Sequence, residues 1–186
     1  MSDYIADEQG PDAEPITDLD QLVAHILRGA KPESDWVVGT EVERIALDPE
    51  TGEAAPFSGE RGVEAILRGM CERFGWEPKE ESGRIIGLSR GESSITLEPG
   101  GQFELSGAPL QTIHQTCDEV HTHLAQVKEV GDELGIGMLG LGFDPKWTRN
   151  EVPWMPKGRY SIMKRWMQEV GTLGLDMMLR LSLIHI

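Results

Sequence analysis

Glutamates in strand-like contexts are the side chains of this sequence best placed to do chemistry. Glu41 and Glu43 stand two apart in the extended run 36–47, so a strand there puts both on one face. Two ionised carboxylates side by side on a half-buried face repel each other and lose hydration. A hard divalent cation would relieve that conflict, because Mg²⁺ is held by a few carboxylates together with substrate phosphates.

Glu98 and Glu104 form a second pair, on either side of the turn 99–101. A three-residue turn makes Glu98 face Gln102 and puts both carboxylates on the polar side of an antiparallel hairpin. A two-residue turn would pair Leu97 with Gln102 and mix polar with apolar faces. The pattern therefore favours the three-residue turn, and we expect both glutamate pairs to converge on one sheet face.

Alternating polar residues are also typical of a plain solvated sheet face, so the pattern alone leaves that alternative open. A second group, His114, Cys117 and His121, could present three metal ligands on one helix face. Cys117 falls in an apolar stripe, however, which favours a buried thiol flanked by edge histidines.

Lys157 and Arg159 stand just before an expected helix that runs from about residue 160 to 170. They could clamp a phosphate or a carboxylate, since arginine offers a two-pronged donor, or they could simply cap the helix. The sequence has no GxxxxGK[ST], HExxH, GxSxG or CxxC, and no GxGxxG that follows a strand. P-loop, dinucleotide-binding and serine-hydrolase chemistry are thereby excluded.

Composition limits the class of protein further. The chain has 186 residues, a net charge of −15 and a pI near 4.7, which argue against nucleic acid or an anionic membrane as partner. Two cysteines are too few for a disulfide framework, which favours a reducing compartment. We therefore expect a cytoplasmic protein. Residues 1–16 hold five acidic residues, two prolines and no basic residue, so we expect a disordered leader there.

Helical periodicity and short extended runs alternate along the rest of the chain. Helices are expected from Asp18 to about 28, after a cap at Ser58, and along a long stretch that follows Pro109. The strands between them are mostly linked as hairpins. This order predicts an α+β fold with a mainly antiparallel sheet and flanking helices.

Four strings of the sequence resemble the plant and proteobacterial type of glutamate–cysteine ligase. The resemblance covers about residues 18–180, and the string 97–107 is highly specific to that family. The strings are Gly39-Thr40-Glu41-Val42-Glu43, Ile95-Thr96-Leu97-Glu98-Pro99-Gly100-Gly101-Gln102-Phe103-Glu104-Leu105-Ser106-Gly107, and Met155-Pro156-Lys157-Gly158-Arg159-Tyr160 with Gly174-Leu175-Asp176-Met177-Met178.

The resemblance implies a curved antiparallel sheet related to that of glutamine synthetase. It also implies the first step of glutathione synthesis: ATP phosphorylates the γ-carboxylate of L-glutamate, and the amine of L-cysteine then displaces phosphate. Mg²⁺, ATP, L-glutamate and L-cysteine are the implied cofactor and small-molecule partners, with a monomer or homodimer as the assembly. By the resemblance, the metal-binding and catalytic residues are Glu41, Glu43, Glu98 and Glu104, and the substrate-binding residues are Gln102, Lys157 and Arg159.

The sequence departs from the family pattern after Arg180. We therefore expect residues 17–180 to be the N-terminal part of a catalytic domain and residues 181–186 to be an unrelated tail from a truncation. Such a fragment would be inactive by itself. The alternatives are another carboxylate–amine ligase of the same fold, or a non-catalytic acidic binding module.

Overall fold

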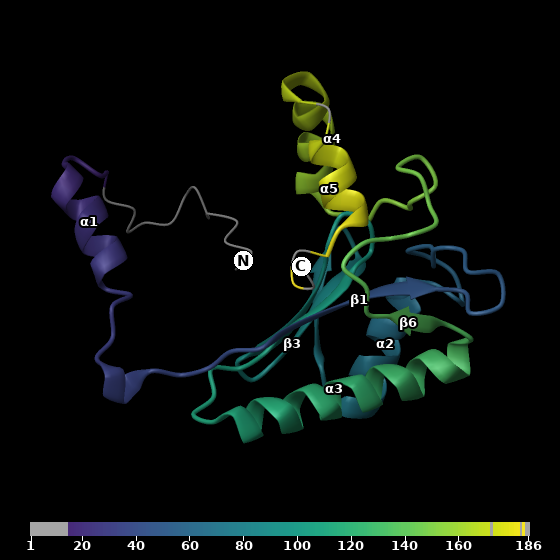
Figure 1. The fold of residues 1–186 in the computed structure, drawn as a ribbon, viewed down its shortest axis with the longest axis horizontal. Coiled ribbons are helices and arrows are strands. Elements are labelled where there is room, and N and C mark those ends of the chain that lie inside the picture. Colours follow the sequence, from purple (N-terminus) through teal and green to yellow (C-terminus); the bar gives the residue numbers. More distant parts are fainter. Residues whose placement is uncertain (1–14, 172, 183, 185–186) are drawn as a thin grey trace. The chain divides into compact units, whose positions relative to one another are not determined.

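Figure 1 shows the fold in a computed structural model, which describes residues 15–171, 173–182 and 184. The described chain divides between Trp36 and Val37 into two units. Nearly all of the expected disordered leader, residues 1–16, lies outside the described residues.

The first unit carries helix α1 (Leu19–Leu27) and a short 3-10 turn (Glu33–Asp35). The Asp18 side chain accepts a hydrogen bond from the Gln21 backbone N–H at 2.9 Å, which closes a capping box. The predicted start of this helix is confirmed. None of its residues is buried within the described chain.

The second unit is built on a six-stranded antiparallel sheet with the order β2-β3-β4-β5-β1-β6. Its strands are β1 (Glu41–Leu47), β2 (Glu77–Glu81), β3 (Arg84–Arg90), β4 (Ser93–Leu97), β5 (Phe103–Ser106) and β6 (Gly137–Leu139). The predicted α+β fold with an antiparallel sheet is confirmed. β1 is shorter than the extended run 36–47, and β2, which is almost entirely polar, was not expected.

Helices of the described chain flank the sheet, and only one of its faces is covered by a helix pair (Figure 1). α2 and α3 pack together on one face, and α4 and α5 stand at one end on the other side. The helix bounds are α2 (Val63–Phe74), α3 (Ile113–Leu134), α4 (Gly158–Val170) and α5 (Gly174–Arg180). No helix of the described chain is long and apolar enough to cross a membrane.

The core lies between the sheet and the pair α2–α3. Strand residues at alternate positions point into it, because successive side chains of a strand face opposite sides. Ile95, Leu97 and Phe103 are completely buried there against Leu67 and Met70 of α2, among others. The same alternation leaves the polar positions of these strands on the opposite face.

The start of α2 differs from the sequence prediction. Its N-cap is Gly62 rather than Ser58, and no side chain caps it. The Val63 N–H donates instead to Pro56 O at 2.9 Å, and a Cβ on Gly62 would lie 2.6 Å from Phe57 O. A tightly folded loop therefore precedes the helix, and glycine is required at this close approach.

Candidate active site

The β4–β5 hairpin has the predicted three-residue turn. The Glu98 N–H donates to Gln102 O, and the Gly101 N–H donates to Glu98 O, both at 2.9 Å. Gly101 has φ +85°, a left-handed conformation that favours glycine. Glu98 and Gln102 thus face each other, and Glu104 pairs with Thr96 in the predicted register.

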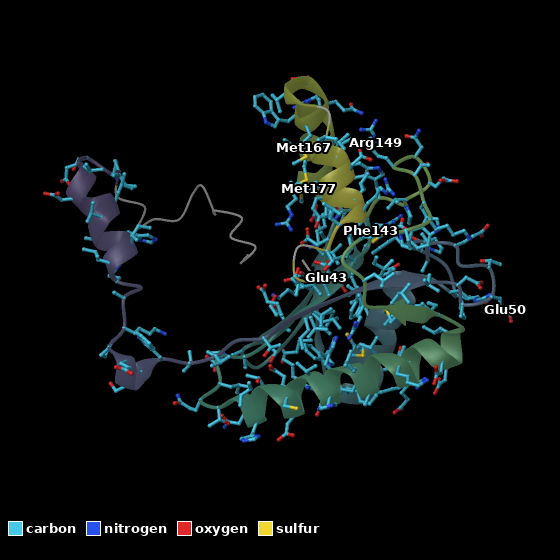
Figure 2. The ribbon with its side chains drawn as sticks, in the orientation of Figure 1. Glu43, Glu50, Phe143, Arg149, Met167 and Met177 are labelled. Carbon is cyan, nitrogen blue, oxygen red and sulfur yellow. The ribbon has the colours of Figure 1, made fainter. Side chains whose placement is uncertain are left out.

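β1 lies next to β5, and this pairing brings the two glutamate pairs together. Glu43 is directly opposite Glu104, and Glu41 is opposite Ser106. Side chains at such positions share a face, with Cβ atoms about 5 Å apart, and like charges there destabilise the sheet. Figure 2 shows Glu43 on the side of the sheet turned away from α3.

Burial and repulsion between carboxylates raise the pKa values of Glu43 and Glu104. Burial raises the pKa of Glu43 to about 7; a hydrogen bond from the Ser182 hydroxyl opposes the rise, and repulsion from the other three glutamates adds to it. Burial also raises the pKa of Glu104, with repulsion from Glu98 and Glu41 adding to it and a hydrogen bond from Ser106 opposing it. Glu41 and Glu98 thus both act on the two buried carboxylates.

The segment that ends α5 covers part of this face. The Gln102 side-chain amide donates to Leu181 O at 2.8 Å and to Met178 O at 3.4 Å. Glu43 Oε1 and Gln102 Oε1 are buried and have no hydrogen-bond partner among the described residues. Gln102 thus holds α5 against the hairpin, and its substrate-binding role stays a prediction.

Lys157 and Arg159 lie beside the same hairpin. The Tyr160 hydroxyl donates to Leu97 O, which fixes the start of α4 next to the end of β4. The Lys157 ammonium nitrogen and the Arg159 guanidinium carbon lie 5.6 and 5.1 Å from the centre of the Tyr160 ring. Both cations are therefore held beside Tyr160, with Lys157 buried and Arg159 exposed.

The donor set suits a hard cation held by few protein ligands. Glu43 and Glu104 are both carboxylates with raised pKa values, and one buried Glu43 oxygen has no hydrogen-bond partner in the described part of the chain. Mg²⁺ takes one or two carboxylates and completes its shell with water and phosphate. No three His, Cys, Asp or Glu side chains of the described residues are arranged to hold a metal ion. The four-glutamate metal site stays a prediction.

The group His114, Cys117 and His121 on α3 differs from the expectation. Cys117 is exposed rather than buried, with its sulfur 3.4 Å from His121 Nδ1. The buried histidine is His123, which is 2% exposed and stacks on Phe103. Cys117 was expected in the apolar stripe, but Ile113 and Cys117 lie on the solvent side of α3. Farther along the helix, Val120, Leu124, Val127 and Leu134 do pack against the core.

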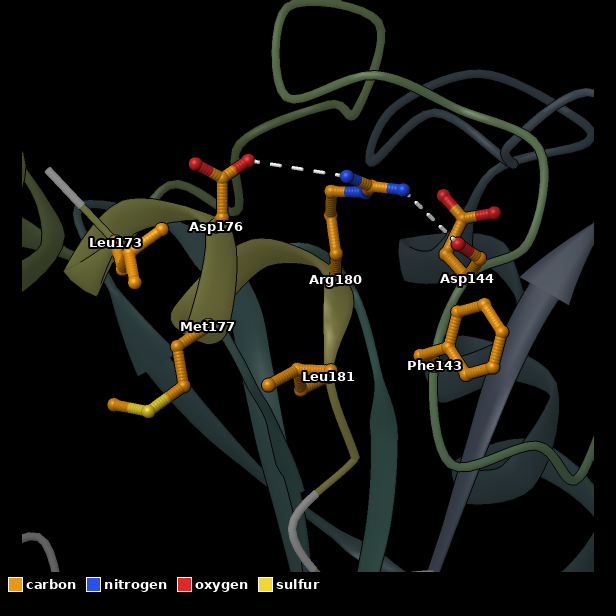
Figure 3. A pocket seen from close by; sticks show the side chains of 7 residues that line it. All are labelled: Phe143, Asp144, Leu173, Asp176, Met177, Arg180 and Leu181. Atoms are coloured by element: carbon orange, nitrogen blue, oxygen red, sulfur yellow. Dashed lines mark hydrogen bonds and ion pairs between the residues drawn. The ribbon is translucent and has the colours of Figure 1, made fainter.

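An apolar pocket adjoins α5 and was not foreseen from the sequence (Figure 3). It has a volume of about 360 Å³ and is lined mainly by Phe143, Leu173, Met177 and Leu181. Arg180 closes one side, and its guanidinium donates to Asp144 O at 3.2 Å. Leu181 thus borders this pocket and also accepts the hydrogen bond from Gln102.

The open six-stranded antiparallel sheet with its flanking helices is an α+β fold. Residues 37–186 match the family model described as glutamate–cysteine ligase family 2 (GCS2), and the chain belongs to this family. The match includes residues 181–186, and Ser182 is fully buried. The unrelated tail expected from residue 181 stays a prediction.

Curated relatives agree with the family assignment. The chain is 51% identical over 173 residues to glutamate–cysteine ligase A, chloroplastic, of Oryza sativa subsp. japonica, covering 93% of this chain and 34% of that protein. It is 53% identical over 174 residues to the chloroplastic glutamate–cysteine ligase of Nicotiana tabacum, covering 94% and 33%. The chain thus spans about a third of the length of these relatives.

The expected cytoplasmic location is wrong by this comparison, because these relatives carry chloroplastic names. That expectation rested on the low cysteine count and on the acidic first residues. A low cysteine count argues only against an oxidising compartment, so it does not distinguish the cytoplasm from other reducing compartments.

Proposed function

We propose that this chain is the N-terminal part of a glutamate–cysteine ligase that makes γ-glutamylcysteine, the first step of glutathione synthesis. In this reaction a γ-carboxylate oxygen of L-glutamate attacks the γ-phosphorus of ATP, and ADP leaves. The amine of L-cysteine then attacks the γ-glutamyl phosphate, and phosphate and a proton leave. The family membership and the relatives' names support the ligase class.

The observation that carries the proposal is the acidic face centred on Glu43 and Glu104. Their opposed carboxylates would hold Mg²⁺, with Glu41 and Glu98 beside them. One buried Glu43 oxygen has no hydrogen-bond partner among the residues that the structure describes. A bound Mg²⁺ would neutralise charge on the phosphates of ATP. Phosphoryl transfer depends mainly on positioning and charge stabilisation, so it needs no nucleophilic side chain.

Lys157 and Arg159 are suited to the anionic part of the substrates. Both lie against Tyr160, whose hydroxyl donates to Leu97 O, the residue before Glu98. We assign to them the glutamate carboxylate or a phosphate group, since arginine binds either through two parallel hydrogen bonds. The carboxylates of the sheet and these cations would thus align metal, nucleotide and acid.

The substrate assignment is tested by product analysis on the full-length protein that contains this sequence. Incubation with ATP, Mg²⁺, L-glutamate and L-cysteine should yield γ-glutamylcysteine and ADP in equal amounts. A panel of other amines in place of cysteine serves as the control. Faster ADP release with another amine would assign the chain to a different carboxylate–amine ligase.

The 186-residue chain by itself should form no γ-glutamylcysteine, because it spans about a third of its relatives' length. The comparison is made at matched molar concentrations of the chain and the full-length protein. Product formation by the short chain at a comparable rate would contradict the proposal that the site needs residues from elsewhere.

A further inference from the structure

A groove of about 520 Å³ runs between α3 and the strands β1 and β6. Arg44 of β1 borders it, and Arg44 alternates with Glu43 along the strand. The groove therefore lies on the helix-covered side of the sheet, opposite the glutamates. Its apolar walls include Leu124, Val127 and Met138.

Arg44 is a half-buried cation with no counter-charge among the described residues. Three arginines of the described residues are half-buried, and the other two have partners: Arg90 donates to Phe74 O, and Arg180 pairs with Asp176. Arg44 has no hydrogen bond or ion pair to any described residue, and its guanidinium rests on Gly140 where a Cβ would clash. Partial burial of an unpaired charge is costly, and a bound anion would offset that cost.

The remaining charges of the groove cancel each other. Lys128 donates to Asp132 at 2.5 and 2.8 Å across one turn of α3. The groove therefore carries the single positive charge of Arg44, although the chain as a whole has a net charge of −15. One guanidinium above apolar walls fits a singly charged ligand with an apolar body.

His123 lies near enough to Arg44 for the charge of Arg44 to act on it. It is buried one turn before Val127, and neither ring nitrogen has a hydrogen-bond partner among the described residues. Burial lowers its pKa to about 4, and the positive charges of Arg44 and Arg90 lower it further. No carboxylate contributes to that shift.

We propose that this groove binds a small organic carboxylate. The carboxylate lies on the Arg44 guanidinium through paired hydrogen bonds, and the aliphatic part lies along Leu124, Val127 and Met138. A planar monocarboxylate matches the two-pronged donor and the single charge better than a phosphate dianion does. The site is separate from the acidic face, so it stands or fails independently of the proposed ligase activity.

The test is a titration of the 186-residue chain with hexanoate, followed through the Arg44 side-chain N–H and the His123 ring signals in NMR spectra. Acetate, hexanamide and inorganic phosphate are titrated in parallel. We expect hexanoate to shift both signals saturably and to bind more tightly than each of the other three. Acetate lacks the apolar body, hexanamide lacks the charge, and phosphate lacks both the planar shape and the apolar body.

Variants of Arg44 test whether this side chain binds hexanoate. Arg44→Gln should weaken hexanoate binding about 10- to 100-fold, the loss expected when a charged hydrogen-bonding partner is removed. Arg68→Gln, which changes an exposed arginine of α2 outside this groove, should leave the affinity unchanged. Should Arg44→Gln fail to fold, Arg44→Lys serves instead, because it keeps the charge, loses the fork and should bind more weakly than the unchanged chain.

Several results would overturn the proposal. These are unchanged hexanoate affinity in the Arg44 variant that folds, an absence of saturable binding by the unchanged chain, or tighter binding of phosphate than of hexanoate. Equal affinity for hexanoate and hexanamide would also overturn it, because the charge of Arg44 would then play no part.

Discussion

The Glu43 carboxylate lies in a position that disfavours its charge. It is 4% exposed, faces Glu104 across the strand pair, and receives one hydrogen bond from Ser182 while its Oε1 has no partner in the described chain. Such a residue lowers the stability of the fold unless a ligand compensates it. We interpret it as a group retained for binding rather than for folding.

Glu43→Gln should therefore stabilise the metal-free chain above neutral pH. The pKa of Glu43 is about 7 in the fold against an ordinary 4.5, so the unfolded chain loses this proton first as the pH rises. The contribution of Glu43 to the free energy of unfolding therefore falls as the pH rises from 4.5 to 7, and it stays constant at higher pH. The variant should gain on the order of 1–3 kcal/mol at pH 8 and much less at pH 4.5. Urea unfolding in chelator measures both values, and an equal difference at both pH values would contradict this account.

His123 should give the opposite pH dependence. Its pKa falls from an ordinary 6.5 to about 4 because it is buried and lies near Arg44 and Arg90. The unfolded chain therefore binds a proton before the folded chain does, and stability falls as the pH drops from 6.5 to 4.

His123→Met, which fills the site with an apolar side chain, should remove most of this acid sensitivity. The unchanged chain should lose on the order of 1–3 kcal/mol more than the variant between pH 7 and pH 4.5. His121→Met, on the exposed side of α3, is the matched control. Parallel stability curves for the unchanged chain and the His123 variant would show that His123 is not the buried titrating group.

At the scale of the elements, the β4–β5 hairpin and α5 depend on each other. Gln102 donates to two carbonyls at the end of α5, and a Cβ on Gly100 would collide with Leu179 O. Met155 N–H also donates to Pro99 O at 3.0 Å. The turn that carries Glu98 is thus fixed from outside the hairpin.

Gly100→Ala should weaken this contact. Because the added methyl group meets backbone rather than a flexible side chain, α5 must move, at a cost of about 1–3 kcal/mol. Urea unfolding and amide exchange in α5 measure the effect. Gly171→Ala is the control, since its Cβ would meet nothing within 4 Å and its φ of −174° suits any residue. Equal stability of the two variants would contradict the close contact.

Helices and strands could be predicted where polar and apolar residues alternate regularly along the sequence. The hairpin register followed from the alternation around 99–101, because only a three-residue turn separates the polar from the apolar positions. The buried face of α3 followed only in part: Val127 is buried as expected, whereas His123 also occupies the buried stripe and Ile113 lies outside it. β2 was missed because an exposed, charged edge strand shows no apolar alternation.

Contacts between distant segments were beyond sequence analysis. Nothing near Ser182 indicates that its hydroxyl reaches Glu43, and nothing near Gln102 indicates that its amide binds the end of α5. These contacts depend on how α5 lies on the sheet. The parity of the glutamates was predictable, whereas the degree of burial that raises the pKa of Glu43 and Glu104 was not.

At the scale of the whole molecule, the two faces of the sheet have different roles. One face carries the opposed glutamates, and the other carries the core with Arg44 at its edge. The chain spans about a third of its relatives' length, so the acidic face is one part of the site that we propose for the full-length ligase. The central claim is that these carboxylates support phosphoryl transfer.

The most direct test is the rate of ATP turnover by the full-length protein in the presence of L-glutamate and L-cysteine, measured for Glu98→Gln and for Glu72→Gln. Glutamine keeps the shape and one carbonyl oxygen but removes the charge. Glu98→Gln should therefore lower the rate by about 10²–10³-fold, as the loss of one electrostatic contact to a transition state does. Glu72→Gln, on the exposed side of α2, should leave the rate within about twofold. A near-normal rate for Glu98→Gln would contradict the account.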